Sequence, residues 1–188
     1  MKKYLLITFL ILANFGCGGG GGGGGGGNGS NAETGVRFLN AAVDGAPLAL
    51  YTAADQEAPL GKAYFAEATN YVEVDSGASI LTLSALNNKA DVAFTVAASV
   101  EDGQRKSLLV YGTRESHTYN AVLLSDPTPA VESGKSAVRV VHGIRGVPSV
   151  DVDASGTQLA STLPLANGSA YVAIPAGVLQ FRVRNHGN

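Results

Sequence analysis

Apolar and polar residues alternate in short runs along most of the chain from Val36 onward. Turn-forming sequences such as Asp44-Gly45 and Asp75-Ser76-Gly77 separate these runs. Alternation with a period of two residues predicts β-strands. We expect strands at 36–42, 48–53, 69–74, 79–86, 92–100, 105–113 and 118–125. Short strands at spacings of about ten residues predict an all-β fold of antiparallel, immunoglobulin-like β-sandwich repeats.

The alternating pattern starts again after a stretch at 126–136, whose prolines cannot donate hydrogen bonds to a sheet. Val36-Arg37-Phe38-Leu39-Asn40 aligns with Val138-Arg139-Val140-Val141-His142 at an offset of 102 residues. Tyr71-Val72 aligns with Tyr171-Val172 at an offset of 100 residues. A slip of one residue would turn the core side chains of a strand towards solvent, so the preserved phase predicts a tandem repeat.

The predicted organisation has a first repeat at 36–125, a linker at 126–136 and a partial second repeat at 137–188. The second repeat has no counterparts of the last three expected strands of the first repeat. Half a sandwich would expose apolar side chains and an unpaired sheet edge, which favours aggregation. Two explanations stay open. The sequence is part of a longer protein, which we favour, or another chain completes the second repeat by strand addition.

Residues 1–16 have the layout of a lipoprotein signal peptide. Lys2 and Lys3 precede an apolar stretch that is too short for a transmembrane helix, which needs about 20 residues. Gly16 followed by Cys17, the only cysteine of the chain, resembles a lipobox. We expect cleavage before Cys17 and acylation of Cys17 with fatty acids such as palmitate. A free cysteine after an ordinary cleavage site is the alternative.

Glycine dominates residues 17–35, with an uninterrupted run from Gly18 to Gly27. Such a segment buries no apolar surface and has maximal backbone freedom, so it predicts a disordered tether. Its root-mean-square reach is about 25 Å. The expected location is the bacterial cell envelope, with the membrane as partner through the lipid anchor. The residue that follows Cys17 is Gly18 and not an aspartate. By resemblance to sorted lipoproteins, this favours the outer membrane.

Charge and motifs argue against several classes of function. Without Lys2 and Lys3, 11 of the 13 basic residues remain against 15 acidic residues, a formal net charge of −4. This balance argues against nucleic acid as a partner. The sequence has no phosphate-binding loop, nucleophile elbow or HExxH zinc motif. We expect a protein that is not an enzyme and has no cofactor.

A family resemblance follows from the second repeat. The sequence Val138-Arg139-Val140-Val141-His142, followed by Pro148 and Val150-Asp151-Val152, resembles the signature of the DUF4397-type domain. This uncharacterised domain occurs in tandem in bacterial envelope lipoproteins. The resemblance covers residues 36–188 and implies a β-sandwich in the cell envelope, without an established activity. In the first repeat, Asn40 takes the place of the histidine.

The motif residues His142, Asn40, Pro148 and Asp151 are the candidate site residues. His142 ends an apolar strand, where its ring can hydrogen-bond the backbone of the following turn, so we expect a structural role. Asp151 and Asp153 share one face of a strand. Two carboxylates on one face suit a hard cation such as Ca²⁺, but they also suit any half-exposed strand. We favour the second interpretation and expect no metal site.

The leading functional hypothesis is a lipid-anchored envelope protein with non-catalytic binding or adhesive β-sandwich modules. The expected partner is a glycan or another envelope protein. The first alternative is a structural envelope component that assembles by strand addition. The second is an envelope hydrolase, in which His142 or His117 would meet a serine or a carboxylate.

Overall fold

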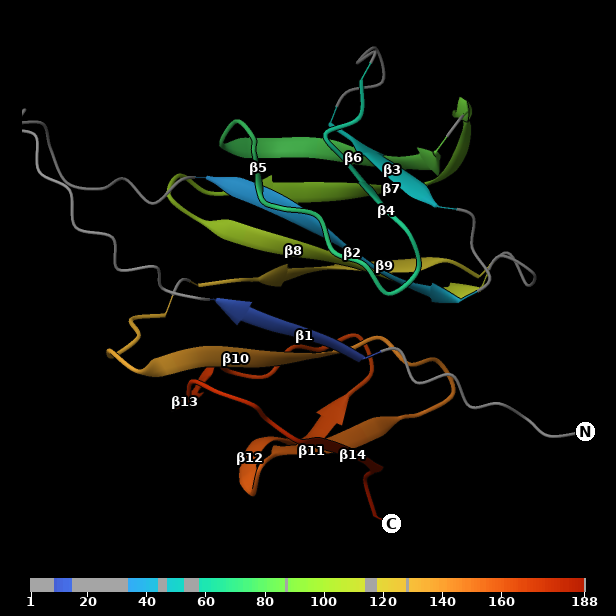
Figure 1. Ribbon diagram of the computed structural model, residues 1–188. Coiled ribbons are helices and arrows are strands. Elements are labelled where there is room, and N and C mark those ends of the chain that lie inside the picture. The colour runs from blue at the N-terminus through green and yellow to red at the C-terminus, as the bar shows by residue number, and fades with distance from the viewer. Residues whose placement is uncertain are drawn as a thin grey trace, which may run out of the picture.

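The computed structural model describes residues 9–14, 34–43, 47–52, 58–86, 88–113, 118–127 and 129–187. These residues form an all-β structure of fourteen strands in four small sheets, and no helix occurs among them. The described part of the chain therefore has no helix of the length and apolarity that a membrane span needs. Cys17, the glycine run and His117 lie outside the described residues. Figure 1 shows an upper body and a lower body of strands.

The upper body consists of two four-stranded sheets, with the orders β5-β2-β8-β9 and β4-β3-β6-β7. Its strands are β2 (Gly35–Val43), β3 (Leu48–Tyr51), β4 (Gly61–Ala63), β5 (Val72–Glu73), β6 (Gly77–Ala85), β7 (Asn88–Val100), β8 (Arg105–Thr113) and β9 (Asn120–Ser125). The two sheets face each other across one core. Phe38 and Leu108 enter this core from the first sheet, and Leu50 and Leu83 enter it from the second.

Two features of the upper body differ from the expectations. The alternation pattern does not predict β4, because three residues are too few to show a period. The pairing of β2 with β8 is parallel over nine residue pairs, whereas we expected only antiparallel pairs. Between these strands the chain crosses to the second sheet for β3 and β4, returns to the first for β5, and crosses again for β6 and β7. Such a crossover allows two strands of one sheet to point the same way.

The lower body contains β10 (Lys135–His142), β11 (Ser149–Ala154), β12 (Thr157–Pro164), β13 (Val172–Pro175) and β14 (Phe181–Asn185). Its sheets have the orders β1-β10-β13 and β12-β11-β14. Val140, Val152, Leu163 and Ile174 are buried in its core. The alternation pattern does not predict β12, because the ladder between β11 and β12 shifts register and the pattern of buried residues shifts with it.

The lower body repeats the first five strands of the upper body in order and pairing. β11 pairs with β12 and β14 as β3 pairs with β4 and β6. β10 pairs with β13 as β2 pairs with β5. An isolated bridge joins Val141 to Gly168, as another joins Leu39 to Ala68. The two copies therefore share one topology over these strands.

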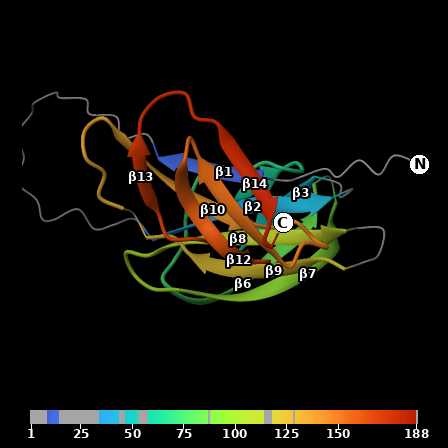
Figure 2. The same ribbon diagram turned by 90° about the horizontal axis from the view of Figure 1, so that it is seen from below.

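The strand β1 (Phe9–Asn14) comes from the predicted signal peptide and pairs antiparallel with β10. Its register runs from Phe9 opposite His142 to Asn14 opposite Ala137. Both ribbon views show β1 alongside β10 (Figures 1 and 2). β13 lies on the other edge of β10. β1 thus occupies the edge of β10 that corresponds to the edge of β2 occupied by β8.

The two bodies meet through the faces of β2, β8 and β10 that point away from the two cores. Leu39, Ala41, Leu109 and Val141 form a separate buried cluster at this contact. As a result, β2 is covered on both faces, and eight of its nine residues are buried. Nearly continuous apolar sequences are typical of strands covered on both faces.

Candidate functional site

Asp126 is a buried carboxylate between β9 and β10, where the two bodies meet. Its side chain is 0% exposed. Oδ1 accepts hydrogen bonds from Nη1 of Arg139 at 3.2 Å and from the hydroxyl of Tyr171 at 2.5 Å. Oδ2 accepts hydrogen bonds from Nη2 of Arg37 and the hydroxyl of Tyr71. One aspartate therefore binds side chains of both bodies.

These donors come from equivalent positions of the two copies, Arg37 with Arg139 and Tyr71 with Tyr171. Each body thus contributes one arginine and one tyrosine to the same carboxylate. Ser107 of the upper body adds a further donor to Asp126. Its Oγ also accepts a hydrogen bond from Nε of Arg37 at 2.8 Å. The junction is therefore a hydrogen-bonded network with Asp126 at its centre and with donors from both bodies.

The surroundings keep Asp126 charged and the two phenols neutral. Burial by itself would raise the pKa of Asp126, but hydrogen bonds from the serine and both tyrosines, together with the charge of Arg37, lower it. Burial, with the neighbouring carboxylate, raises the pKa values of Tyr71 and Tyr171. Each phenol therefore keeps the proton that it donates.

Arginine side chains also lie over both tyrosine rings of the network. The guanidinium carbon of Arg37 is 4.7 Å from the ring centroid of Tyr71, and that of Arg105 is 4.9 Å from the same centroid. The guanidinium carbon of Arg139 is 5.8 Å from the ring centroid of Tyr171. Such contacts stabilise the cations beside a single carboxylate. Because Asp126 is fully covered, this arrangement suits a structural junction and not a site for a substrate.

Gly143 shows how closely the two bodies approach. It directly follows β10, and a Cβ atom at this position would lie 2.6 Å from Cβ of Ala41 in the upper body. That separation is shorter than real Cβ contacts allow, so any larger residue would push the bodies apart.

Asn40 and His142 occupy equivalent positions, and both hydrogen-bond backbone groups. Oδ1 of Asn40 accepts the backbone N–H two residues later at 3.1 Å, and Nδ2 donates to the carbonyl of Ala63 at 3.1 Å. Nδ1 of His142 likewise accepts the N–H two residues later at 3.3 Å, so its Nε2 carries the proton and donates to the carbonyl of Val147 at 3.0 Å. Burial lowers the pKa of His142 against the opposing effect of that hydrogen bond.

Pro148 and Asp151 lie at the start of the second lower sheet. The carbonyl of Pro148 accepts a hydrogen bond from the N–H of Leu165. The carboxylate of Asp151 accepts the N–H of Thr162 at 2.7 Å and lies 3.1 Å from Nδ1 of His186. The backbone N–H of Thr162 is the main cause that lowers the pKa of Asp151.

The residues Thr162, His186 and Asp151 have the chemical types of a catalytic triad, but their geometry does not match one. Oγ1 of Thr162 is 3.2 Å from Nδ1 of His186, the nitrogen that Asp151 also approaches, and 3.3 Å from Nε2. A triad needs the nucleophile and the carboxylate on opposite ring nitrogens. Asp153 pairs with Arg184 at 3.1 Å. Among the described residues, no three His, Cys, Asp or Glu side chains converge in a way that would hold a metal ion.

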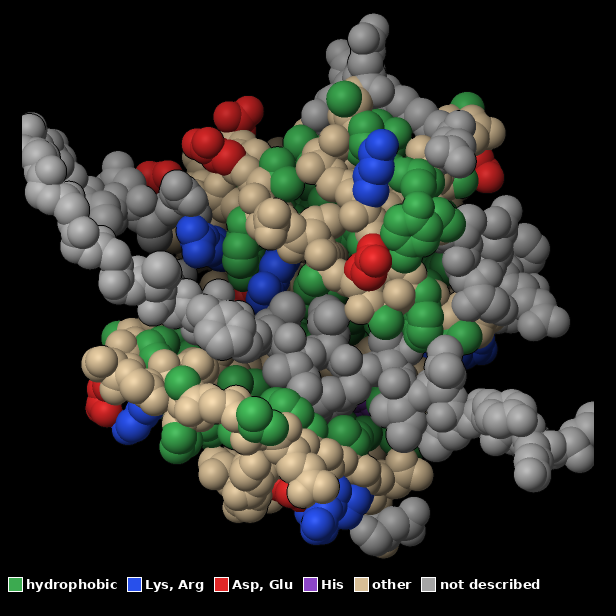
Figure 3. All heavy atoms as spheres, in the orientation of Figure 1, with side chains coloured by type: hydrophobic (Ala, Val, Ile, Leu, Met, Phe, Trp, Pro, Cys, Tyr) green, Lys and Arg blue, Asp and Glu red, His purple; other side chains and the backbone are tan. Residues whose placement is uncertain are grey.

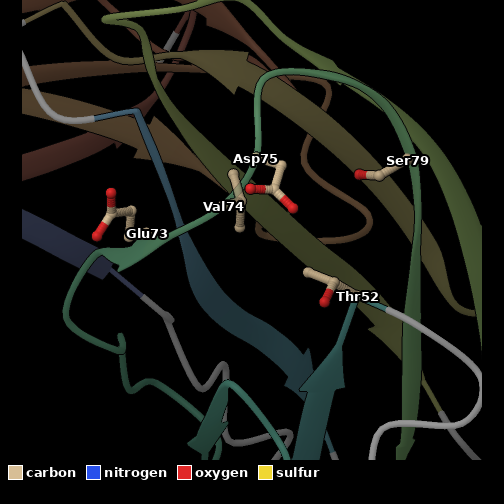
Figure 4. A pocket seen from close by; sticks show the side chains of 5 residues that line it. All are labelled: Thr52, Glu73, Val74, Asp75 and Ser79. Carbon is tan, nitrogen blue, oxygen red and sulfur yellow. The ribbon is translucent and has the colours of Figure 1, made fainter.

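The upper body carries an open hollow of about 470 Å³ beside the turn between β5 and β6. Its lining residues are Thr52, Glu73, Val74, Asp75 and Ser79. In Figure 4 the Asp75 carboxylate lies above Thr52, with Ser79 on one side, while Glu73 lies beyond Val74. The hollow therefore presents carboxylate and hydroxyl oxygens from two segments of the chain, Thr52 after β3 and residues 73–79.

The comparison with protein families decides the membership of the chain. The family described as "Domain of unknown function (DUF4397)" matches residues 34–153, which is more than half of the sequence. The chain belongs to the DUF4397 family. A comparison with curated proteins finds no match. The DUF4397 match includes β2 to β10 and β11 except for its last residue, and therefore Asn40, His142, Pro148 and Asp151.

The central residue of the DUF4397 junction was not among the candidates predicted from the sequence. Asp126 is the first residue of the expected linker, and its partners Arg37 and Arg139 were used only to align the repeats. The sequence of both repeats nevertheless contains a feature that indicates a buried charged group. Each arginine interrupts an otherwise apolar strand at the same position, and a buried charge needs a partner.

Proposed function

We propose that this DUF4397 protein is a lipid-anchored component of the cell envelope whose repeats are non-catalytic binding or adhesive modules. The upper body, with two facing sheets, supports an immunoglobulin-like β-sandwich as the module. The proposal for binding rests on one observation, the hollow beside Asp75. The junction at Asp126 supports it, because a fixed pair of bodies presents such a hollow in a defined orientation.

The chemistry of the hollow fits a glycan. A volume of about 470 Å³ is in the range of ligand sites, which are about 300–1,000 Å³. The carboxylate of Asp75 accepts hydrogen bonds from sugar hydroxyls, and the hydroxyls of Thr52 and Ser79 can donate as well as accept them. The two carboxylates of the lining disfavour anionic ligands. Figure 3 shows basic and acidic side chains interspersed on the visible face of the described residues, without one extended basic patch.

The test for the hollow is glycan binding by the full chain and its variants. We expect fluorescently labelled protein to bind at least one envelope glycan on an array, and Asp75→Ala to weaken that binding at least tenfold. Asp91→Ala is the matched control, because Asp91 is an exposed aspartate on β7, outside the lining of the hollow. Absence of glycan binding, or equal binding by both variants, would refute the assignment of the hollow. Cleavage of the bound glycan would instead support the hydrolase.

The anchor is tested at Cys17. We expect the unmodified chain, expressed in a bacterium, to incorporate an alkyne analogue of palmitate and to fractionate with outer membranes. Cys17→Ser removes the only thiol of the chain and should abolish both properties. Palmitate labelling that persists in Cys17→Ser would contradict the anchor.

The second candidate function is assembly by strand addition. The pairing of β1 with an edge of the lower body favours it, because this strand comes from outside that body.

A further inference from the structure

The lower body carries a second hollow, of about 220 Å³, at the end of the ladder between β11 and β14. The sheet that contains this ladder lies on the side of the lower body away from the upper body (Figure 1). The lower hollow is therefore separate from the junction at Asp126 and from the hollow beside Asp75. Its lining residues are Asp153, Ser155, Gly156, Gln180, Phe181 and Arg182.

The two hollows have equivalent positions in the two copies but linings of different charge. The hollow beside Asp75 lies where β3 ends and β6 begins, and the lower hollow lies where their counterparts β11 and β14 end and begin. At the offset of 100 residues, Ala173 and Pro175 take the places of Glu73 and Asp75. The lining of the lower hollow instead combines one aspartate with one arginine. The two hollows therefore suit ligands of different charge.

The ion pairs along this ladder leave the guanidinium of Arg182 without a partner among the described residues. Arg182 is directly opposite Asp153 in the ladder. Asp153, however, pairs with Arg184 at 3.1 Å, and Asp151 lies 3.1 Å from Nδ1 of His186. Each aspartate thus contacts the basic residue two positions beyond the one opposite to it. The exposed cation at the hollow is therefore available to an anionic ligand.

A tight turn fixes the other polar groups of the lower hollow. Ser155 and Gly156 connect β11 to β12 in a two-residue turn, with φ values of 46° and 87°. The N–H of Ser155 donates to the carbonyl of Gln180 at 2.8 Å, and Oγ of Ser155 accepts the N–H of Gln180 at 3.1 Å. The hydroxyl of Ser155 can still donate a hydrogen bond. The side-chain amide of Gln180 has no hydrogen bond within the described part of the chain, so it too can bind a ligand.

A strand on the other edge of β14 would not cover this hollow. In the upper body, β7 pairs with β6 on the edge away from β3. The corresponding edge of β14 is the one away from β11, whereas the hollow is lined by β11, by the turn after it and by the start of β14. The hollow therefore stays accessible whichever polypeptide segment pairs with that edge.

We propose that the lower hollow binds a sugar residue that carries a carboxylate, such as a uronic acid of an acidic glycan. The guanidinium of Arg182 pairs with the ligand carboxylate, because its planar fork matches two carboxylate oxygens. The amide of Gln180 and the carboxylate of Asp153 hydrogen-bond the sugar hydroxyls, and Phe181 offers apolar surface to the ring carbons. The negative charge of Asp153 disfavours a doubly charged phosphate.

The size of the lower hollow agrees with a single sugar residue. Its volume of about 220 Å³ is below the range of about 300–1,000 Å³ that larger ligands fill. The inference goes beyond the hollow beside Asp75, because it concerns other residues and another class of ligand.

The test uses the fluorescently labelled full chain on an array in which each uronic acid glycan stands beside its methyl ester. The ester keeps the hydroxyls of the acid but has no negative charge. We expect the chain to bind at least one acid at least tenfold more tightly than its ester. Arg182→Gln should weaken that binding at least tenfold. Lys62→Gln, which removes an exposed cation on β4 outside the hollow, is the matched control and should bind as the unmodified chain does.

Several results would overturn the proposal: no binding of any uronic acid glycan, equal binding of acids and esters, equal binding by Arg182→Gln and Lys62→Gln, and a preference for phosphorylated sugars over the acids. If urea denaturation shows that Arg182→Gln does not fold, Gln180→Ala takes its place, because it changes another exposed side chain of the hollow. Asp75→Ala should leave binding of the acids unchanged. Failure of this proposal and failure of the proposal for the hollow beside Asp75 are therefore distinguishable.

Discussion

At the scale of single residues, His142 and Asn40 show how two different side chains meet one backbone requirement. Each accepts the N–H two residues later and donates to a buried backbone carbonyl, that of Ala63 at the end of β4 for Asn40 and that of Val147 in the turn after β10 for His142. A buried backbone group that loses its partner costs about 1–3 kcal/mol. This explains why the position holds a polar residue in both copies, although the residue types differ.

Replacement of His142 should therefore lower the free energy of unfolding, and the decrease should be larger when more of its hydrogen bonds are lost. His142→Ala removes both contacts and leaves a cavity, and we expect it to lower the free energy of unfolding by about 3 kcal/mol. His142→Asn retains an acceptor for the N–H of Ile144 and should lower it less. Urea denaturation at pH 7.5 measures the difference. Equal losses in the two variants would show that these hydrogen bonds do not matter.

The same residue should make stability depend on pH. Burial lowers the pKa of His142 in the folded state, while the unfolded value is about 6.5. Below that value the unfolded chain binds a proton more readily than the folded chain, so the contribution of His142 is present above about pH 6.5 and is lost as pH falls through the folded pKa. Between pH 7.5 and 5, the unmodified chain should lose more stability than His142→Asn. Parallel pH profiles would contradict this.

At the scale of elements, period-two alternation predicts strands well where one regular ladder is formed. Leu48 and Leu50 of β3, and Leu81 and Leu83 of β6, point into the core as their spacing predicts. The pattern fails at β12, where Leu159 and Ala160 are adjacent in sequence and both buried. Alternation also carries no information on strand direction, and so the parallel pairing of β2 with β8 could not be predicted from it.

The junction at Asp126 could not be predicted from the sequence pattern either, but for a different reason. Arg37 is 89 residues from Asp126, and no spacing rule links a strand residue to a carboxylate so far along the chain. The prolines after Asp126 made the segment resemble an exposed linker. Only the packing of the two bodies shows that its first residue is buried between two arginines.

At the scale of the whole molecule, Asp126 and the apolar cluster around Leu109 make one unit of the two bodies. The cluster supplies apolar contact, and the carboxylate fixes the orientation, because it bonds equivalent residues from each side. Breaking a buried ion pair by removing one partner costs about 3–5 kcal/mol. We therefore expect Asp126→Asn to lower the free energy of unfolding by about 3 kcal/mol or more.

The loss of stability in Asp126→Asn should appear at the contact between the bodies and not in their separate cores. Hydrogen exchange should become faster at Leu39, Leu109 and Val141, while Leu50 in the upper core keeps its protection. Urea unfolding of the variant should separate into two transitions, because each body retains its own core. Asp91→Asn, an exposed aspartate on β7, is the control and should unfold as the unmodified chain does. A single transition with uniform loss of protection in Asp126→Asn would mean that the apolar cluster alone couples the two bodies.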